Sequence, residues 1–163
     1  LFPGALAGGW GGTIRVLAQG LGLELDEITQ NYECLPALED FETPMGTIRR
    51  GTRAAIRFEV MGMVGGEPRL VVEHVTRMHD ELGPDWPQSD GGYELIIEGV
   101  PRMVCRLEMQ DEHGDHAVGG VILTATRLVN AIPDLVAAAP GALTGIDLPL
   151  VTGRGLLDAK TPA

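Results

Sequence analysis

Basic residues and cysteines are scarce in this chain. Its 163 residues carry 12 Lys and Arg against 23 Asp and Glu, a formal net charge of −11, and no lysine precedes Lys160. Such a surface repels phosphate backbones and anionic lipid, so we expect no nucleic-acid partner and no membrane partner. The two cysteines, Cys34 and Cys105, have neither a metal-binding nor a redox CxxC spacing. We therefore expect free thiols and a reducing, cytoplasmic location.

Long apolar runs and nucleotide-binding fingerprints are also missing. No apolar run approaches the roughly 20 residues that span a bilayer, and no Lys or Arg precedes the first apolar stretch, as it would in a secretory signal. Neither GxGxxG nor GxxxxGK followed by Ser or Thr occurs in the chain. The glycine-rich segment 8–12 has the wrong spacing and no strand before it. We expect it to be a flexible entry to the first helix, packed by Trp10.

Helical spacing of apolar residues occurs near both ends. A hydrophobic fraction of 44% can form one core, so residues 1–163 are expected to make a single domain. The pattern predicts a first helix over 13–21, ended by Gly20 or Gly22. It predicts a second helix around 122–132, which Pro133 should kink or restart. The segment 35–50 has the prolines and glycine of a loop.

Strand patterns fill the middle of the chain. Gly65-Gly66 supplies a tight turn between two of the predicted strands. Alternation of apolar and polar residues predicts strands in the segments 25–34, 54–60, 70–74, 93–97 and 103–109. The order of helix, strands and helix predicts an α+β fold: a two-layer sandwich with a mixed or antiparallel sheet of four or more strands, covered on one face by helices. An extended segment from Leu148 to Gly155 should follow.

Two segments carry groups that can bind a small polar ligand. His74 lies in the middle of a predicted strand. Its imidazole is either a core side chain satisfied by one backbone hydrogen bond, or a donor or general acid aimed at a pocket at the sheet edge. In the loop from Thr43 to Thr47, a glycine stands beside hydroxyls. Its N–H groups can converge on a carboxylate, or the loop is an ordinary turn with a Thr cap. These alternatives stay open.

Other polar residues have structural interpretations. Arg127, Asn130 and Arg154 stand beside apolar stretches, where a salt-bridging or capping role is more usual than a ligand contact. The run 111–116 contains three acidic residues and two histidines, but a solvated turn explains it, and no second His or Cys pair supports a metal site. We expect no metal ion.

Several segments resemble one known family when taken together. The similar segments are Pro3-Gly4-Ala5-Leu6-Ala7 through Trp10-Gly11, Leu21-Gly22-Leu23-Glu24-Leu25-Asp26-Glu27-Ile28, Arg57-Phe58-Glu59-Val60, Glu73-His74-Val75-Thr76-Arg77, Asp85-Trp86-Pro87, Asn130-Ala131-Ile132-Pro133 and Asp147-Leu148-Pro149-Leu150-Val151-Thr152-Gly153-Arg154-Gly155. As a set, they resemble dihydrodipicolinate reductase-like proteins, and within these the C-terminal domain of 2,4-diaminopentanoate dehydrogenases and their relatives.

The resemblance implies a division of labour between two domains. In that family an N-terminal Rossmann domain holds NAD or NADP, and the C-terminal domain binds substrate and forms the oligomer. This chain would be the second part alone, with no cofactor site of its own, which agrees with its start at Leu1 instead of Met. We expect a substrate that is an amino acid, a diamine or a related imine.

The resemblance also implies substrate contacts. Dihydrodipicolinate reductases bind the substrate carboxylate at an Asp-Ala-Pro-Ser-Gly-Thr loop, and Gly46 and Thr47 match its end. The His pair and the Lys of those enzymes are missing, so reduction of tetrahydrodipicolinate is not expected. The candidate substrate-binding residues are Thr43, Gly46, Thr47, His74, Arg77 and Asn130.

The leading interpretation is therefore the substrate-binding and assembly half of an oxidoreductase, inactive in isolation. The alternative is a non-catalytic small-ligand-binding or dimerisation module with the same fold. Apolar residues on the second face of the central strands, Met61, Met63, Val71 and Val75, predict a homo-oligomer formed through the sheet.

Overall fold

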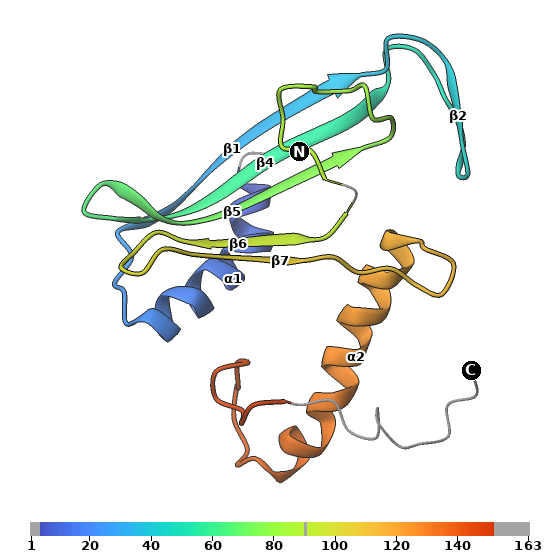
Figure 1. The fold of residues 1–163 in the computed structure, drawn as a ribbon. Helices are drawn as coiled ribbons and strands as arrows, with labels where there is room; N and C mark the ends of the chain where they lie inside the picture. Colours follow the sequence, from blue (N-terminus) through green and yellow to red (C-terminus); the bar gives the residue numbers. More distant parts are fainter. Residues whose placement is uncertain (1–3, 90, 152–163) are drawn as a thin grey trace. The chain divides into compact units, whose positions relative to one another are not determined.

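The computed structural model describes residues 4–89 and 91–151 (Figure 1). The chain divides into two compact units, Leu1–Gln88 and Ser89–Ala163. The first unit contains α1 (Ala5–Leu21), β1 (Glu27–Pro36), β2 (Phe41–Thr43), β3 (Gly46–Ile48), β4 (Arg53–Val64) and β5 (Glu67–Arg77). The second contains β6 (Tyr93–Ile97), β7 (Met103–Leu107) and α2 (His116–Ala137). The predicted α+β class is confirmed.

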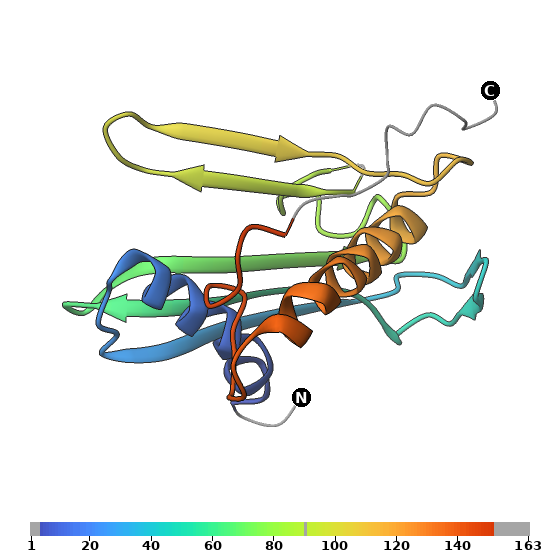
Figure 2. The same ribbon diagram turned by 90° about the horizontal axis from the view of Figure 1, so that it is seen from below.

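The first unit is built on a three-stranded antiparallel sheet in the order β1-β4-β5, with α1 against one face (Figures 1 and 2). The buried core between helix and sheet consists of Leu6, Ile14, Ala18, Phe58, Val60 and Leu70. Gly62 lets the helix come this close: a Cβ added there would lie 2.8 Å from Ile14 Cγ2. A larger residue would therefore force a shift at the point where α1 crosses β4.

α1 begins well before the predicted Thr13, at Ala5. Glycines disfavour a helix, yet two tertiary features stabilise this one. The Gln30 side chain on β1 accepts a hydrogen bond of 2.8 Å from the free backbone N–H of Ala7. In addition, Leu6 is buried in the core.

The opposite face of the same sheet carries charge as well as apolar side chains. The Arg57 guanidinium lies 2.7 Å from a carboxylate oxygen of Glu73, 3.2 Å from Glu33 and 3.8 Å from Glu59. Glu73 is the main reason why the pKa of Arg57 is raised. At one end of this face, Val75 packs beside the buried Leu82 and Trp86 cluster, so Val75 is not part of an open apolar face.

The segment expected to be a loop, 35–50, contains a short hairpin. β2 and β3 pair antiparallel, with Phe41 opposite Ile48 and Thr43 opposite Gly46. Each strand has only three residues, too few to show an alternating pattern, which is why the hairpin escaped sequence analysis.

The second unit consists of the β6–β7 hairpin and α2. The strands described are distributed over three antiparallel sheets of three, two and two strands. A sheet of four or more strands was expected; β6 and β7 instead pair only with each other. The Asp115 side chain caps α2 by accepting from the N–H groups of Ala117 and Val118, and these bonds lower the pKa of Asp115.

α2 differs from the sequence prediction in two respects. It runs through Pro133 without a restart and ends at Ala137. Its 22 residues are also long and apolar enough, by length and composition, to cross a membrane, a run that the sequence analysis did not expect. Such a helix is weak evidence for a membrane span. Of the extended tail predicted from Leu148 to Gly155, residues 152–155 lie outside the described residues.

Candidate functional site

Four ring-bearing side chains meet on the face of the sheet that α1 covers. Tyr32 of β1 lies opposite Phe58 of β4, and Phe58 lies opposite His74 of β5. The ring centroid of Trp10 on α1 lies 5.4 Å from that of Phe58 and 5.8 Å from that of His74. We call Trp10, Tyr32, Phe58 and His74 the aromatic cluster. Backbone register and helix packing thus bring together residues that are far apart in sequence.

His74 supplies most of the polar chemistry of this cluster. Its ring stacks on Phe58 at 5.0 Å with an interplanar angle of 25°. Its Nε2 lies 2.6 Å from the Thr76 hydroxyl oxygen, so its partner is a side chain and not the backbone. Burial lowers the pKa of His74 below the ordinary imidazole value. The ring is therefore neutral at pH 7 and can donate through one nitrogen and accept through the other.

Toward one end of the strands, the neighbours of the cluster are exposed or half-buried. Cys34 and Thr76 are exposed on either side of the half-buried Ile56. Since side chains two residues apart share a face of a strand, these three lie next to Tyr32, Phe58 and His74 on the same face. His74 itself is half-buried, so part of its side chain is accessible to solvent.

The loop between Thr43 and Thr47 forms an internally bonded turn. The Thr43 hydroxyl donates to the Gly46 carbonyl at 2.7 Å and accepts from the Met45 N–H at 3.2 Å. The Thr47 hydroxyl donates to Glu42 at 2.7 Å. Gly46 has φ +116°, which favours glycine in any case. The turn with a Thr cap accounts for these bonds, and a substrate contact at Thr43, Gly46 or Thr47 stays a prediction.

Arg77 lies on the other face of β5 from His74, because the two are three residues apart on one strand. Its guanidinium donates to the carbonyls of Leu82 at 2.8 Å, Gly83 at 3.2 Å and Pro87 at 2.9 Å. It also lies 5.9 Å from the ring centroid of Trp86. Arg77 therefore organises the segment after β5, and the structure does not place Arg77 and His74 in one site.

The remaining polar candidates lie in the second unit. Asn130 is on α2, where it is half-buried, and a substrate contact there stays a prediction. Arg154 lies outside the described residues. In the run 111–116, Asp111 accepts from the N–H groups of His113 and Asp115. Among residues 4–89 and 91–151, no three His, Cys, Asp or Glu side chains are placed to hold a metal ion.

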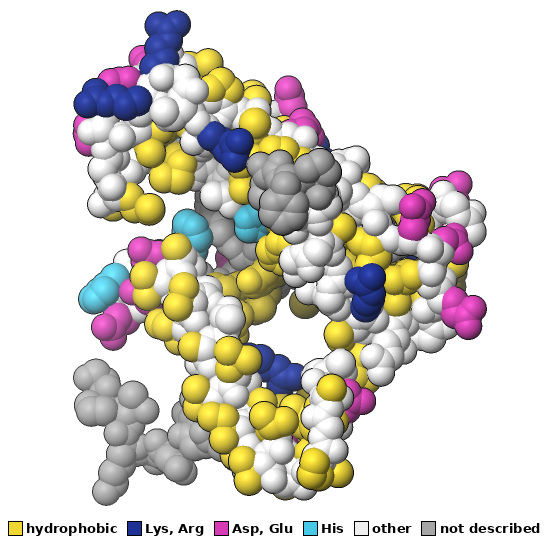
Figure 3. All heavy atoms as spheres, turned by 180° about the vertical axis from the view of Figure 1, so that it is seen from behind, with side chains coloured by type: hydrophobic (Ala, Val, Ile, Leu, Met, Phe, Trp, Pro, Cys, Tyr) yellow, Lys and Arg dark blue, Asp and Glu magenta, His cyan; other side chains and the backbone are white. Residues whose placement is uncertain are grey.

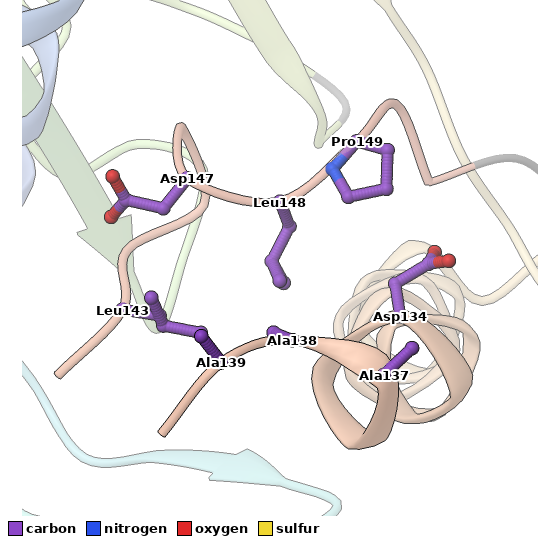
Figure 4. Close-up of a pocket in the computed structure, with 8 residues that line it drawn as sticks. All are labelled: Asp134, Ala137, Ala138, Ala139, Leu143, Asp147, Leu148 and Pro149. Atoms are coloured by element: carbon purple, nitrogen blue, oxygen red, sulfur yellow. The ribbon is translucent and has the colours of Figure 1, made fainter. Parts of the chain in front are cut away.

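A hollow of about 410 Å³ lies at the C-terminal end of α2 (Figure 4). Asp134 and Asp147 are on its rim, but Figure 4 shows their carboxylates pointing away from each other, with Leu148 between them. Asp147 accepts two hydrogen bonds from Thr144, which lower the pKa of its carboxyl. The hollow therefore lacks converging polar groups, and the aromatic cluster is the better candidate site.

Sequence analysis found His74 but missed its neighbours. Trp10 was predicted to pack the entry to a helix, and Tyr32 and Phe58 fell in two predicted strands, 25–34 and 54–60, without a link between them. One signal was available: Phe58 and His74 alternate in step with the apolar residues of two strands that a tight turn joins, which indicates one shared face of the sheet. The distance from Trp10 to His74 is a property of helix packing that no local pattern contains.

Comparison with known proteins gives one consistent result. Residues 4–159 match the 2,4-diaminopentanoate dehydrogenase C-terminal domain family. An amine dehydrogenase of Streptomyces virginiae is 45% identical over 157 residues, 93% of this chain and 43% of that protein. A 2,4-diaminopentanoate dehydrogenase of Acetoanaerobium sticklandii is 31% identical over 150 residues, 90% of this chain and 39% of that protein. The chain thus spans about two fifths of the length of these curated relatives.

A solved structure supports the fold. The structure of amine dehydrogenase from Mycobacterium smegmatis superposes with a TM-score of 0.62 at 22% identity. The superposition covers 86% of this chain and 38% of the other. At this identity the likeness concerns the fold alone.

Proposed function

The chain belongs to the 2,4-diaminopentanoate dehydrogenase C-terminal domain family, and we propose that it forms the substrate-binding and assembly part of an NAD(P)-dependent oxidoreductase acting on an amine. The substrate would be an amino acid, a diamine or the related imine. Family membership and the names of the two curated relatives support the amine chemistry.

The observation that carries the proposal is the neutral imidazole held among aromatic rings. An amine substrate is largely an ammonium ion at pH 7, and it would gain from the electron-rich face of the partly exposed Trp10 ring. A protonated histidine would repel that ion, whereas burial keeps His74 uncharged. His74 can then accept a hydrogen bond from the substrate nitrogen while Thr76 fixes the ring. Trp10 is 38% exposed and would contact the substrate's carbon skeleton.

The nicotinamide cofactor would be held by a domain outside this chain. The glycine-rich stretch from Gly8 to Gly12 lies inside α1. Its N–H groups are used within the helix, so they cannot form the loop that receives a pyrophosphate. We accordingly assign the NAD or NADP site to another domain and only substrate positioning to this one.

We propose a cytoplasmic location and expect no nucleic-acid partner. Cys34 and Cys105 are free and exposed, which supports a reducing compartment. The net charge of −11 supports the exclusion of nucleic acid.

The experiment compares two histidine variants in the full-length polypeptide. His74→Phe keeps a stacking ring but removes both ring nitrogens, so kcat/KM for the amine should fall about tenfold or more, the equivalent of one lost hydrogen bond to a charged group. The control is His113→Phe, because the His113 side chain is 80% exposed in a turn of the second unit. Equal kinetics for His74→Phe and wild type would contradict the site. Ligand binding without turnover of any amine would instead favour the non-catalytic module.

A further inference from the structure

The two ring nitrogens of His74 have different surroundings. Nε2 lies 2.6 Å from the hydroxyl oxygen of Thr76, which is a close hydrogen bond. Nδ1 has no hydrogen-bond partner among residues 4–89 and 91–151. Among the buried and half-buried residues described, the only fully enclosed side-chain polar atom without a partner is the Tyr32 hydroxyl. Nδ1 of the half-buried His74 is therefore neither bonded nor fully enclosed, and it remains for a further partner.

The orientation of the His74 ring is determined by contacts within the first unit. Its plane is held by stacking on the buried Phe58 and by the Trp10 ring of α1. Stacking alone allows the ring to turn by half a revolution about its Cβ–Cγ bond, because this torsion is roughly two-fold. In the turned ring a carbon atom would lie where Nε2 lies, and the hydrogen bond to Thr76 would be lost. The Thr76 hydroxyl thus determines which edge of the ring carries the free nitrogen.

The Thr76 hydroxyl can pair with either neutral form of the ring. A neutral imidazole carries one proton, and a threonine hydroxyl can donate or accept. If Thr76 donates, the proton of His74 lies on Nδ1, and the free edge offers a donor. If Thr76 accepts, the proton lies on Nε2, and Nδ1 offers its lone pair. An amine, an ammonium ion and an iminium ion all present N–H groups, and only the second form can accept from them.

We propose that Thr76 is a positioning residue: its hydroxyl accepts from Nε2–H of His74 and so leaves the Nδ1 lone pair for an N–H group of the substrate. This inference rests on the proposed function, to which it adds a specificity. The ketone that corresponds to an amine has a carbonyl oxygen, which only accepts hydrogen bonds and is repelled by a lone pair on Nδ1. The pair of His74 and Thr76 therefore selects the nitrogen-bearing form of the substrate over the carbonyl form.

The kinetic test replaces Thr76 in the full-length polypeptide, with an amino acid, a diamine and a simple primary amine as substrates and NAD or NADP. Thr76→Val removes the hydroxyl and keeps the shape, so kcat/KM should fall about threefold to tenfold. Thr76→Ser keeps the hydroxyl and should stay within about twofold of wild type. Because Thr76 acts through the imidazole, Thr76→Val should cause no further loss in a His74→Phe background. Inhibition by the corresponding ketone should not weaken in Thr76→Val.

The matched control is Thr29→Val. Thr29 is a half-buried residue of β1, and its hydroxyl has no partner among the described residues. It lies on the other face of the sheet from Tyr32, because the two are three residues apart on one strand. Thr29→Val should keep the wild-type kcat/KM, which separates the loss of the Thr76 bond from the general effect of exchanging a hydroxyl for a methyl group.

A second measurement needs no turnover. In the full-length polypeptide with ¹⁵N-labelled histidine, the nitrogen chemical shifts at about pH 8 show which nitrogen of each neutral ring holds the proton. The signals of His74 are those that His74→Phe removes. Wild type should hold this proton on Nε2, and Thr76→Val should distribute it over both nitrogens. Exposed histidine side chains are visible in Figure 3, and His113, whose side chain is 80% exposed, is the reference that Thr76→Val should leave unchanged.

Four results would overturn the proposal: a proton on Nδ1 of His74 in wild type, wild-type kinetics for Thr76→Val, a loss in Thr76→Ser as large as in Thr76→Val, or a Thr76→Val loss that persists in the His74→Phe background. Equal weakening of amine turnover and ketone inhibition would contradict the specificity. Failure of the proposed function gives a different result. Either no amine is turned over or His74→Phe is fully active, while the proton of His74 still lies on Nε2; the substrate role of Thr76 then falls with that function.

Discussion

Replacing Gly62 by alanine tests the packing of α1 on the sheet, on which the aromatic cluster depends. The new Cβ would lie 2.8 Å from Ile14 Cγ2, 3.0 Å from Leu25 Cδ2 and 3.4 Å from Leu70 Cβ. Ile14 is fully buried, with 0% exposure, and so cannot turn aside without disturbing the core. Overpacking of this kind costs about 1–3 kcal/mol. At roughly 2–4 °C per kcal/mol, the melting temperature should fall by several degrees.

The matched control is Gly12→Ala on α1. A Cβ at Gly12 meets nothing within 4 Å, and alanine favours a helix by up to about 1 kcal/mol over glycine. Gly12→Ala should therefore stabilise the chain in urea denaturation while Gly62→Ala destabilises it. Both substitutions restrict the unfolded chain alike, so their difference reports native packing. Equal stabilities for the two variants would refute the described contact between α1 and β4.

Three further predictions concern single side chains. The Tyr32 hydroxyl is buried without a hydrogen-bond partner among the described residues. Tyr32→Phe should therefore leave the stability of the chain unchanged or raise it by up to about 1 kcal/mol in urea denaturation. A clear loss of stability would show that the hydroxyl is paired. Arg77→Leu leaves the carbonyls of Leu82 and Pro87 without their donor. It should destabilise the folded chain by about 1–3 kcal/mol and change the tryptophan fluorescence. An unchanged spectrum and an unchanged stability would contradict these contacts. Because burial lowers the pKa of His74, the unfolded chain takes up a proton at this histidine before the folded chain does as the pH falls. The free energy of unfolding should therefore decrease below about pH 6.5 in wild type and decrease less steeply in His74→Phe. Parallel pH profiles for the two proteins would contradict the pKa direction.

The register of β4 and β5 shows how far sequence patterns reach. A two-residue turn at Gly65-Gly66 pairs Val64 with Glu67, and direct continuation of that register would set Phe58 opposite Glu73. The alternation of apolar and polar residues in the segments 54–60 and 70–74 is instead consistent with Phe58 and His74 on one face, although sequence analysis did not link the two residues. A bulge at Arg69 resolves the conflict, since Gly62 pairs with Leu70 while Met63 pairs with Pro68. The hydrophobic pattern thus agrees with the observed strand faces, whereas the register set by the turn alone would have placed Glu73 opposite Phe58.

Features that depend on tertiary contacts were beyond sequence reasoning. The glycines before Thr13 have a low helix propensity. The hydrogen bond from the Ala7 N–H to the side chain of Gln30, 23 residues away, favours the earlier helix start. Pro133 argued for a break in α2. On an exposed helix, however, water can solvate the Val129 carbonyl that loses its donor, and the helix continues. Among the site candidates, His74 was found from its strand, whereas its contact with Trp10 depends on how α1 lies on the sheet.

We propose that this chain positions an amine for a nicotinamide-dependent reaction. The most direct test is reduced nicotinamide formed by the full-length polypeptide with NAD or NADP and a panel of an amino acid, a diamine and a simple primary amine. We expect turnover with at least one amine, a strong loss of turnover in His74→Phe, and no turnover with chain 1–163 alone. Failure of every amine, or full activity of His74→Phe, would contradict it.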